Sequence, residues 1–420
     1  MSKAYSAPGK ALLAGGYLVI DPIYNAYVTA LSSRMHAIIT PTETTTTTRH
    51  IKIQSPQFVN GVWEYNITSN LSPPKEINGN NNPFLEAVLF IVLAYIEPES
   101  NYDLTIDIYS DPGYHTQENT TLKQLSSKSF LYHSRAINEV EKTGLGSSAG
   151  LVAVVTTALV SFFKPSDDLN KDLLHNIAQI AHCYAQKKIG SGFDVAAAIY
   201  GSIIFKRFQP EIIDRVFDTL ENNKQEFVKV LKSTIESNWD FKHTPCSLPR
   251  GIRLVMGDIK GGSETPKLVS TVLNWKKNKP QESSIVYANL DAANNNFISQ
   301  LKNLHEQETP LNKELVKPLS DSIVEIRKCL QDLTKKSGAA IEPQVQTDLL
   351  DKCQLIPGVI GGVVPGAGGY DAISLLVLGD ESVDILKKTT ELDKENYNNV
   401  TWVNLHEESE GIIIENAKDY

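Results

Sequence analysis

A glycine-rich segment followed at once by a long apolar run constrains this chain more than any other part of its sequence. Residues 142–150 read KTGLGSSAG, and residues 151–163 are almost all apolar. The apolar run predicts a helix that is buried on nearly all sides. A glycine-rich turn at the entrance of a helix offers unpaired backbone N–H groups and the positive end of the helix dipole, so it suits a bound phosphate. The alternative is a tight connection between a strand and a helix, capped by serines.

Two widespread phosphate-binding motifs fit this segment less well. A Walker A loop needs a Gly-Lys-Ser or Gly-Lys-Thr triplet, which the chain lacks. The Rossmann pattern G-x-G-x-x-A does occur at Gly144, Gly146 and Ala149, with Asp167 and Asp168 roughly 20 residues later. Those aspartates open a predicted helix, whereas the ribose-binding acid of a Rossmann fold should end a second strand. A dinucleotide-dependent oxidoreductase is therefore the weaker alternative.

The acidic charge balance limits the partners of the chain. Its formal net charge is −9, whereas a nucleic acid or an anionic membrane surface requires a broad basic face. We therefore expect no nucleic-acid or membrane partner, and no obligate protein partner is indicated. The first residues, MSKAYSAPGK, lack the apolar core of a secretory signal, which favours a cytoplasmic protein. The four cysteines are widely separated, so neither a zinc site nor a disulfide framework is predicted.

Apolar periodicity and turn residues predict an α+β chain without internal repeats. Strands dominate the first 60 residues, and the polar residues 112–129 are expected to form a long surface loop near the site. A charged stretch at 209–249 indicates a boundary, and we divide the chain into domains at residues 1–215 and 216–420. Helices are expected at 84–96, 151–163, 168–188 (ended by Gly190), 284–305, 311–337 and 345–354, and a β-hairpin is expected over 358–379.

Three segments, in the same order along the chain, resemble the signature motifs of the GHMP small-molecule kinases. They are SAPGKALLAGGYLVI at residues 6–20, KTGLGSSAG at 142–150 and VPGAGGYDAI at 364–373. The resemblance implies a two-domain α+β fold, with an N-terminal domain like domain 2 of ribosomal protein S5 and a ferredoxin-like C-terminal domain. It also implies an ATP-dependent phosphotransferase, with Mg²⁺ as cofactor and ATP in the cleft between the domains.

Three further segments, QKKIGSGFDVAAAIYGSI, MGDIKGGSET and IEPQVQTDLLDKCQ, resemble the fungal branch of this family. The resemblance implies transfer of the γ-phosphate of ATP to phosphomevalonate, giving diphosphomevalonate and ADP in the mevalonate route to isoprenoids and sterols. A member of the family that phosphorylates mevalonate, and a noncatalytic sensor that binds ATP and a small ligand, are the alternatives. Retention of Lys10, Asp194 and the serine pair of the second motif speaks against the sensor.

The resemblance assigns roles to residues of all three motifs. It implies that Lys10 lies at the reacting phosphates, as a catalytic and substrate-binding residue, and that Asp194 is catalytic and lies beside the acceptor. Ser147 or Ser148 would help to hold Mg²⁺. The ATP phosphates would contact Lys142, Thr143, Gly144, Leu145, Gly146, Ser147, Ser148, Ala149 and Gly150, and the substrate would contact Gly366, Ala367, Gly368 and Gly369 of the third motif.

Elementary phosphate chemistry leaves the role of Asp194 open. The second pKa of a phosphate monoester is about 6, so the attacking oxygen is mostly deprotonated at neutral pH and needs no strong general base. Asp194 would then orient Lys10 or a metal, or take a last proton from the acceptor. A purely structural alternative is that Asp194 caps the alanine-rich helix that follows it.

The phosphate of the substrate should be recognised by cations and hydroxyls from segments specific to this branch of the family. Lys260 and Ser263 are preferred, because the Gly-Gly turn between them follows a strand and allows a close backbone approach. The other candidates are Lys188, Ser191 and Gly192 shortly before Asp194, and His133, Ser134 and Arg135 in the segment YHSRAI.

Two departures from the family pattern concern the metal. Many relatives carry a glutamate ligand of Mg²⁺ shortly before the aspartate of the active site, whereas residues 180–188, IAHCYAQKK, contain no carboxylate. The first motif reads AGGY where many relatives have GEY, so Gly16 removes a possible acidic partner. The sequence therefore leaves the set of metal ligands open.

Overall fold

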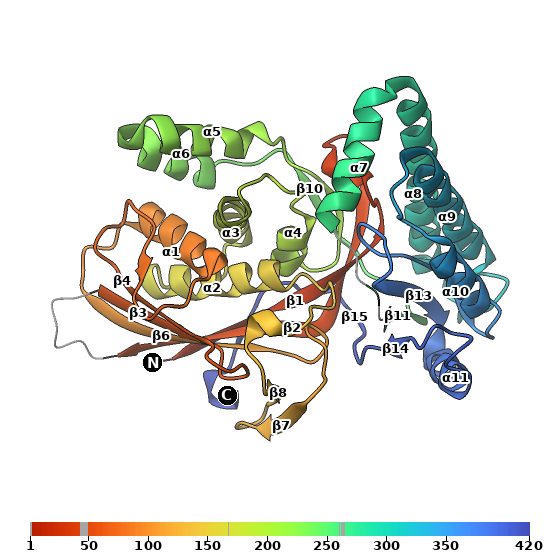
Figure 1. Cartoon of the computed structure of the whole chain (residues 1–420), viewed down its shortest axis with the longest axis horizontal. Coiled ribbons are helices and arrows are strands. Elements are labelled where there is room, and N and C mark those ends of the chain that lie inside the picture. Colours follow the sequence, from red (N-terminus) through yellow and green to blue (C-terminus); the bar gives the residue numbers. More distant parts are fainter. Residues whose placement is uncertain (1, 43–48, 167, 260, 262–264) are drawn as a thin grey trace.

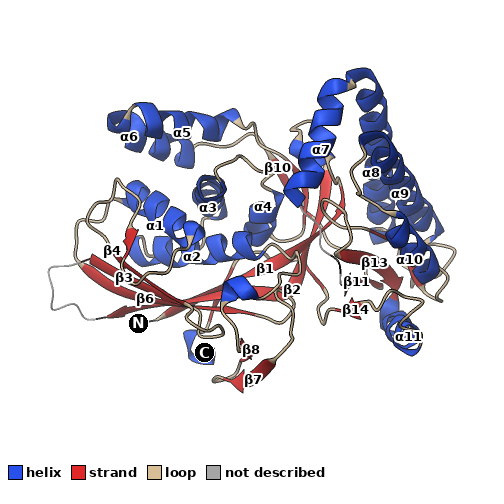
Figure 2. Ribbon diagram, in the orientation of Figure 1, coloured by secondary structure: helices blue, strands red, loops and turns tan. Residues whose placement is uncertain are grey.

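The described part of the chain forms two sheets covered by helices and a small separate hairpin (Figure 1). The computed structural model describes residues 2–42, 49–166, 168–259, 261 and 265–420. Asp167, Lys260 and Ser263, which the sequence singles out, lie outside these described residues. The expected α+β class is confirmed, because helices and largely antiparallel strands are mixed throughout (Figure 2).

Two long antiparallel strands form the centre of the large sheet. β1 (Lys3–Ala14) pairs with β2 (Ala26–Thr42), and the register sets Lys10 opposite Ala30. The register shifts between Pro8 and Gly9, and such an irregularity redirects the side chains that follow it. The other strands of this sheet are β3 (Arg49–Gln54), β4 (Val62–Asn66), β5 (Lys75–Glu76), β6 (Tyr102–Ser110), β9 (Ile203–Lys206), β10 (Lys242–Pro245), β15 (Glu407–Glu408) and β16 (Ile413–Glu415).

Helices cover one face of the large sheet in two layers (Figures 1 and 2). The inner layer consists of α1 (Pro83–Ile96), α2 (Ser147–Phe163), α3 (Lys171–Gln186) and α4 (Phe193–Tyr200). α2 packs against β1 and β2 on one side and against α1, α3 and α4 on the others, which explains its apolar surface all round. The outer layer consists of α5 (Glu211–Asn222) and α6 (Lys224–Glu236), and α6 packs on α1 and α3.

The second half of the chain surrounds the smaller sheet, whose described order is β12-β13-β11-β14. Its central strand β13 buries both faces: Leu376 belongs to the same apolar cluster as α8 and α9, whereas Leu375 and Val377 cluster with α10 and α11. The elements are β11 (Ile252–Asp258), α7 (Thr265–Asn278), α8 (Pro280–His305), α9 (Lys317–Ser337), α10 (Gln344–Gln354), β12 (Val359–Val363), β13 (Ala372–Leu378), α11 (Gly379–Leu392) and β14 (Thr401–Trp402).

The last two strands of the chain join the second half to the first. After β14 the chain returns to the large sheet, where β15 pairs with β2 and β16 pairs with β1. Residue 215, at the expected domain boundary, lies inside α5. The division at residues 1–215 and 216–420 therefore stays a proposal. Among the described residues, no helix combines the length and the apolar composition that crossing a bilayer requires.

Several expectations about individual elements need correction. Residues 112–129 are not one loop, because β7 (Thr120–Gln124) pairs with β8 (Ser129–His133). α3 ends at Gln186 with Lys187 in the left-handed conformation, so Gly190 does not end it. The charged stretch 209–249 contains two helices, and α7 follows the polar turn after β11. Short 3₁₀ turns occur at Leu18–Ile20, Ile137–Glu139 and Ala417–Asp419.

Candidate active site

Residues 142–150, called the phosphate loop below, form a glycine turn at the start of α2. Gly144 and Gly146 have φ angles of 81° and 87°, a region that side-chain-bearing residues rarely adopt. Gly146 is the N-cap of α2, so the backbone N–H groups that follow it lie at the positive end of the helix dipole. This geometry matches the expectation of an anion site at the helix entrance.

The outer end of the phosphate loop is attached to residues 113–115. The backbone N–H of Thr143 donates to the carbonyl of Tyr114 at 3.2 Å, and the Thr143 hydroxyl donates to the carbonyl of Gly113. His115 and Lys142 form an isolated β-bridge. Burial lowers the pKa of His115 to about 4, with the charges of His133 and Lys142 acting in the same direction. Residues 113–115 therefore hold the start of the phosphate loop, a contact that the sequence alone does not predict.

Lys10 reaches the inner end of the phosphate loop from β1. Its ammonium Nζ donates to the carbonyl of Gly144 at 2.7 Å, and its backbone N–H donates to the carbonyl of Leu145 at 3.1 Å. The ammonium also lies 5.5 Å from the centre of the Phe193 ring. Burial lowers the pKa of Lys10, and the negative charge of Asp194 partly offsets that effect. Lys10 therefore lies beside the glycine turn, and its expected position at the reacting phosphates stays a prediction.

Asp194 lies in the first turn of α4, close to Gly146 of the phosphate loop. A Cβ atom added to Gly146 would lie 3.3 Å from Cε of Lys10 and 3.9 Å from Cβ of Asp194. The structure thus brings the first motif, the phosphate loop and Asp194 together around one residue. Asp194 Oδ1 also accepts a hydrogen bond from the N–H of Val195 at 3.0 Å. The alternative that Asp194 caps this helix is wrong, because Gly192 is the N-cap of α4 and Asp194 is its second residue.

The segment that precedes Asp194 is held by a buried arginine that the sequence did not single out. Arg207 is only 6% exposed and donates to the carbonyls of Ile189 at 3.3 Å and Gly190 at 2.7 Å. It also donates to the carbonyl of Ile20, at the end of the first motif. Arg207 therefore fixes the turn before α4 against the loop after β1.

Ser148, in the first turn of α2, has a side-chain partner on α3. Its Oγ lies 3.1 Å from Nε2 of His182, and the amide Nε2 of Gln186 lies 3.2 Å from the same ring nitrogen. His182 is buried, with an exposed fraction of 4%. Burial lowers its pKa, while Asp194 acts in the opposite direction and Lys188 reinforces the effect. His182 was missed because only its residue type and position on α3, not this contact, can be inferred from the sequence.

The third glycine motif contacts the first motif across the junction of the two halves. The Tyr17 hydroxyl donates to the carbonyl of Ala367 at 2.6 Å, and a Cβ atom on Gly16 would lie 3.0 Å from the carbonyl oxygen of Gly366. On the other side, Gly369 N–H donates to the carbonyl of Ile341 at 2.9 Å, and a Cβ atom on Gly368 would come within 2.2 Å of that oxygen. The motif is therefore wedged between the first motif and the segment before α10.

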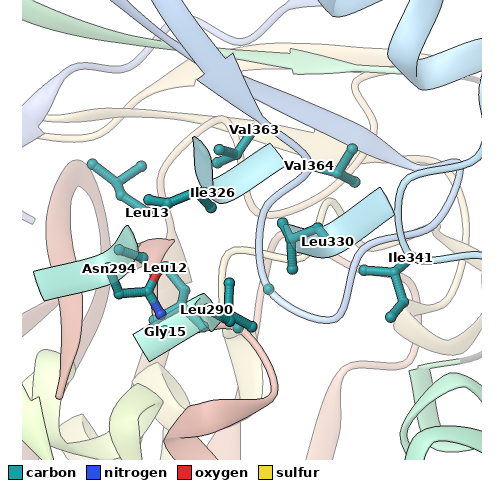
Figure 3. A pocket seen from close by; sticks show the side chains of 13 residues that line it. Leu12, Leu13, Gly15, Leu290, Asn294, Ile326, Leu330, Ile341, Val363 and Val364 are labelled. Atoms are coloured by element: carbon teal, nitrogen blue, oxygen red, sulfur yellow. The ribbon is translucent and has the colours of Figure 1, made fainter. Parts of the chain in front are cut away.

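A narrow pocket with room for about one water molecule lies at this junction (Figure 3). Its wall is mostly apolar, with the loop after β1 on one side and α8, α9 and the third motif on the others. Asn294 of α8 lines the pocket and is fully buried, and within the described part of the chain its amide atoms have no hydrogen-bond partner. The first and third motifs thus meet over an incompletely filled junction.

The candidates for binding the substrate phosphate are spread over separate places. Ser191 and Gly192 directly precede α4 and lie close to Asp194 along the chain, whereas Lys188 is exposed two residues after the end of α3. His133, Ser134 and Arg135 lie at the end of β8, where the His133 ring stacks on Phe58 at 4.7 Å and lies 6.0 Å from the His115 ring. That second group is therefore near the outer end of the phosphate loop, away from Gly146.

The preferred candidates Lys260 and Ser263 lie outside the described residues, but Gly261 between them is described. A Cβ atom on Gly261 would lie 2.9 Å from Cβ of Tyr370, and Ile259 N–H donates to the carbonyl of Asp371 at 2.8 Å. Ile259 and Gly261 thus lie beside the third motif.

The oxygen atoms around the phosphate loop fit Mg²⁺ as a nucleotide-bound ion. Among the described residues, no group of three or more His, Cys, Asp or Glu side chains could enclose a metal. Mg²⁺ usually keeps several waters and binds through one or two protein oxygens together with substrate phosphates. The hydroxyls of Ser147 and Ser148 and the carboxylate of Asp194 are hard oxygen donors of the appropriate kind.

Comparisons with known proteins agree with the motifs. Residues 121–202 match the sequence profile of the GHMP kinases N terminal domain. The chain is 61% identical to phosphomevalonate kinase of Candida albicans, with 100% of this chain and 99% of that relative covered. It is 37% identical to a phosphomevalonate kinase of Aspergillus fumigatus, over 90% of this chain and 88% of that relative.

A solved structure shows the same fold. The Streptococcus pneumoniae phosphomevalonate kinase, in complex with phosphomevalonate and AMPPNP, superimposes with a TM-score of 0.66. The alignment covers 96% of this chain and 99% of that chain, at 16% sequence identity. At this identity the similarity concerns the fold, and it confirms the expected GHMP kinase architecture.

Proposed function

The chain belongs to the phosphomevalonate kinases, a branch of the GHMP kinase family, and we propose that its ATP-dependent reaction takes place where Lys10, Gly146 and Asp194 meet. The observation that carries this assignment is the convergence of Lys10 and Asp194 on the glycine that caps α2. A cation, a carboxylate and a row of helix N–H groups at one point are the parts that phosphoryl transfer requires.

The reaction forms one bond and breaks another at the same phosphorus atom. A phosphate oxygen of phosphomevalonate attacks the γ-phosphorus of ATP, and the bond to the oxygen that bridges the β- and γ-phosphates breaks. The products are diphosphomevalonate and ADP. Because both reactants are anions, charge repulsion is the main obstacle, and fixed positive charge lowers the barrier.

In this proposal the phosphate loop binds the ATP phosphates through the N–H groups at the start of α2. Lys10 places its ammonium between the transferred group and the acceptor. Asp194 needs no strong basicity, since the acceptor oxygen is already deprotonated at neutral pH. Its negative charge raises the pKa of the Lys10 ammonium and so partly offsets the lowering effect of burial. We therefore assign Asp194 the role of holding and orienting charged Lys10.

The residues that would hold Mg²⁺ are Ser147 and Ser148 together with the ATP phosphates. When bound, the ion neutralises part of the phosphate charge. For the substrate phosphate we propose Lys188 and Ser191 beside Asp194. We keep Lys260 and Ser263 as candidates because Gly261, which lies between them in the sequence, is beside the third motif. Residues 366–369 of the third motif would close around the carbon chain of the substrate.

The proposal is tested by supplying purified protein and Mg-ATP with mevalonate, phosphomevalonate, galactose or homoserine and measuring ADP. We expect ADP release with phosphomevalonate, and a Lys10→Met variant that binds ATP but turns over poorly. Turnover of mevalonate but not of its phosphate would contradict the acceptor. ATP binding without turnover of any acceptor would favour the sensor.

We further propose that the enzyme works in the cytoplasm without a nucleic-acid partner. The net charge of −9 supports the second part, since a polyanion would be repelled. Fractionation of cells that express a tagged chain would show cytoplasmic enrichment, and enrichment in an organelle would contradict the location.

A further inference from the structure

His182 stands out among the buried polar groups near the phosphate loop, because its contact is made to the loop itself. Its Nε2 atom lies 3.1 Å from the hydroxyl oxygen of Ser148. The segment around it, residues 180–188, supplies no carboxylate. His182 is 4% exposed, so water does not compete freely for this nitrogen. Within the described part of the chain, the Ser148 side chain therefore makes its hydrogen bond to an imidazole.

The partners of Nε2 determine the direction of the hydrogen bond. The amide nitrogen of Gln186 lies 3.2 Å from Nε2, one helical turn after His182. An amide NH₂ group can only donate, so we assign the tautomer of His182 in which Nε2 accepts. Nε2 has a single lone pair, which the Gln186 amide and the Ser148 hydroxyl share as two donors, and in this tautomer the Ser148 proton points toward α3.

The direction of that proton decides what the Ser148 oxygen can do. A serine hydroxyl has one proton and two lone pairs, and a cation binds only to a lone pair. With the proton directed at His182, both lone pairs stay available on the side of the phosphate loop. A hydroxyl free to rotate would instead share its proton with the nearest phosphate oxygen and lose this preference.

We propose that His182 is a positioning residue that aligns the hydroxyl of Ser148 for Mg²⁺ binding. The inference rests on the proposed role of Ser148 as a ligand of the nucleotide-bound ion. His182 itself contacts neither the metal nor the substrate, and it acts through the proton of Ser148. Groups that orient a metal ligand in this way typically change metal affinity by about 10-fold to 100-fold when removed.

The test measures metal binding directly. Mn²⁺ serves as a paramagnetic probe, and its affinity for the complex of the protein with AMPPNP is measured by electron paramagnetic resonance. Four variants are compared with the parent chain: His182→Phe, His182→Gln, Ser148→Ala and the double variant His182→Phe, Ser148→Ala. Phenylalanine keeps a ring but removes the acceptor, whereas glutamine places an amide oxygen near the former Nε2. Thermal unfolding and AMPPNP binding without metal report whether each variant is folded.

We expect His182→Phe to weaken Mn²⁺ binding about tenfold. His182→Gln should recover most of the affinity. In the Ser148→Ala background, His182→Phe should have no further effect, because the two residues act as a unit. If the phenylalanine variant does not fold, His182→Leu takes its place in the same comparison.

Three results would overturn the inference, and they separate it from the proposed function. If Ser148→Ala weakens Mn²⁺ binding but His182→Phe does not, Ser148 is a ligand and His182 is only packed beside it. If His182→Phe has the same effect with and without Ser148, His182 acts by another route. If Ser148→Ala leaves the affinity unchanged, both this inference and the metal role of Ser148 fail, while ADP release with phosphomevalonate still tests the reaction.

Discussion

The ammonium group of Lys10 donates a 2.7 Å hydrogen bond to the carbonyl oxygen of Gly144, and the backbone N–H of the same residue donates to Leu145 at 3.1 Å. Two bonds from one residue thus join β1 to the phosphate loop. They hold a positive charge at the entrance of α2, where the proposed phosphates bind. The first two signature motifs, far apart in the sequence, are therefore one structural unit.

Replacing Asp194 by asparagine removes its charge but keeps its hydrogen bond to Val195. The Oδ1 atom of asparagine can still accept from Val195 N–H, so the start of α4 should stay intact. We expect kcat to fall about 100-fold or more, because the charge that supports Lys10 is lost. Steady-state kinetics and circular dichroism check this. A decrease below about tenfold, equal to about 1.4 kcal/mol, would leave Asp194 only its local hydrogen bond to Val195.

The lowered pKa of Lys10 predicts a loss of activity at alkaline pH. Burial makes this lysine release its proton at lower pH than a free lysine, so kcat/KM for ATP should fall as the pH rises through that value. Bound phosphates favour the charged form, so the corresponding decrease in kcat should occur at higher pH. Lys10→Arg, if active, should lack both decreases. An alkaline limb that persists in this variant would assign the titration to another group.

Arg207 should hold the turn before Asp194 in place. Arg207→Met leaves the carbonyls of Ile189 and Gly190 without their donor, and each lost buried hydrogen bond destabilises by about 1–3 kcal/mol. We expect a lower free energy of unfolding in urea and a raised KM for phosphomevalonate. Arg215→Met, at an exposed position on α5, is the matched control and should change neither quantity. An unchanged KM in Arg207→Met would show that the turn keeps its shape without the arginine.

Buried His36 and its carboxylate partners predict that the stability of the fold depends on pH. Burial alone would lower the pKa of His36, but hydrogen bonds to Asp111 and Glu415 raise it above the ordinary 6.5. Charged His36 therefore stabilises the fold fully below pH 6.5, and this contribution is lost as the pH rises through the raised pKa.

His36→Asn should remove that loss between neutral and alkaline pH, whereas His406→Asn, at an exposed position, should keep it. Urea unfolding at a series of pH values measures the effect. A parent chain whose stability does not fall with rising pH in this range would contradict the assigned shift.

Much of the fold follows from local sequence signals. The apolar residues 84–96 and 151–163 predicted helices that occur as α1 and α2, and the glycine turn at 364–373 joins the predicted hairpin strands. The helices that were missed expose most of their side chains. α5 is strongly amphipathic, with Ile213 and Val216 buried, so its periodicity was present in the sequence, and the high charge of residues 209–249 was wrongly interpreted as a boundary.

Residues within the motifs could be proposed for the candidate site from the sequence, whereas single long-range contacts could not. The family resemblance singled out Lys10 and Asp194, and the structure brings both of them near Gly146. Arg207 reaches Ile20 and His182 reaches Ser148 from other elements, and neither pairing leaves a local pattern. The one sequence signal near His182 was the absence of a carboxylate from residues 180–188, where many relatives carry a glutamate that binds the metal.

The most direct measurement is a crystal structure of the chain with Mg-AMPPNP and phosphomevalonate. We predict that the triphosphate lies on the N–H groups of residues 146–150, with the ammonium of Lys10 between the γ-phosphate and the phosphate of the acceptor. A triphosphate bound away from Gly146, or an acceptor phosphate out of reach of Lys10, would contradict the account.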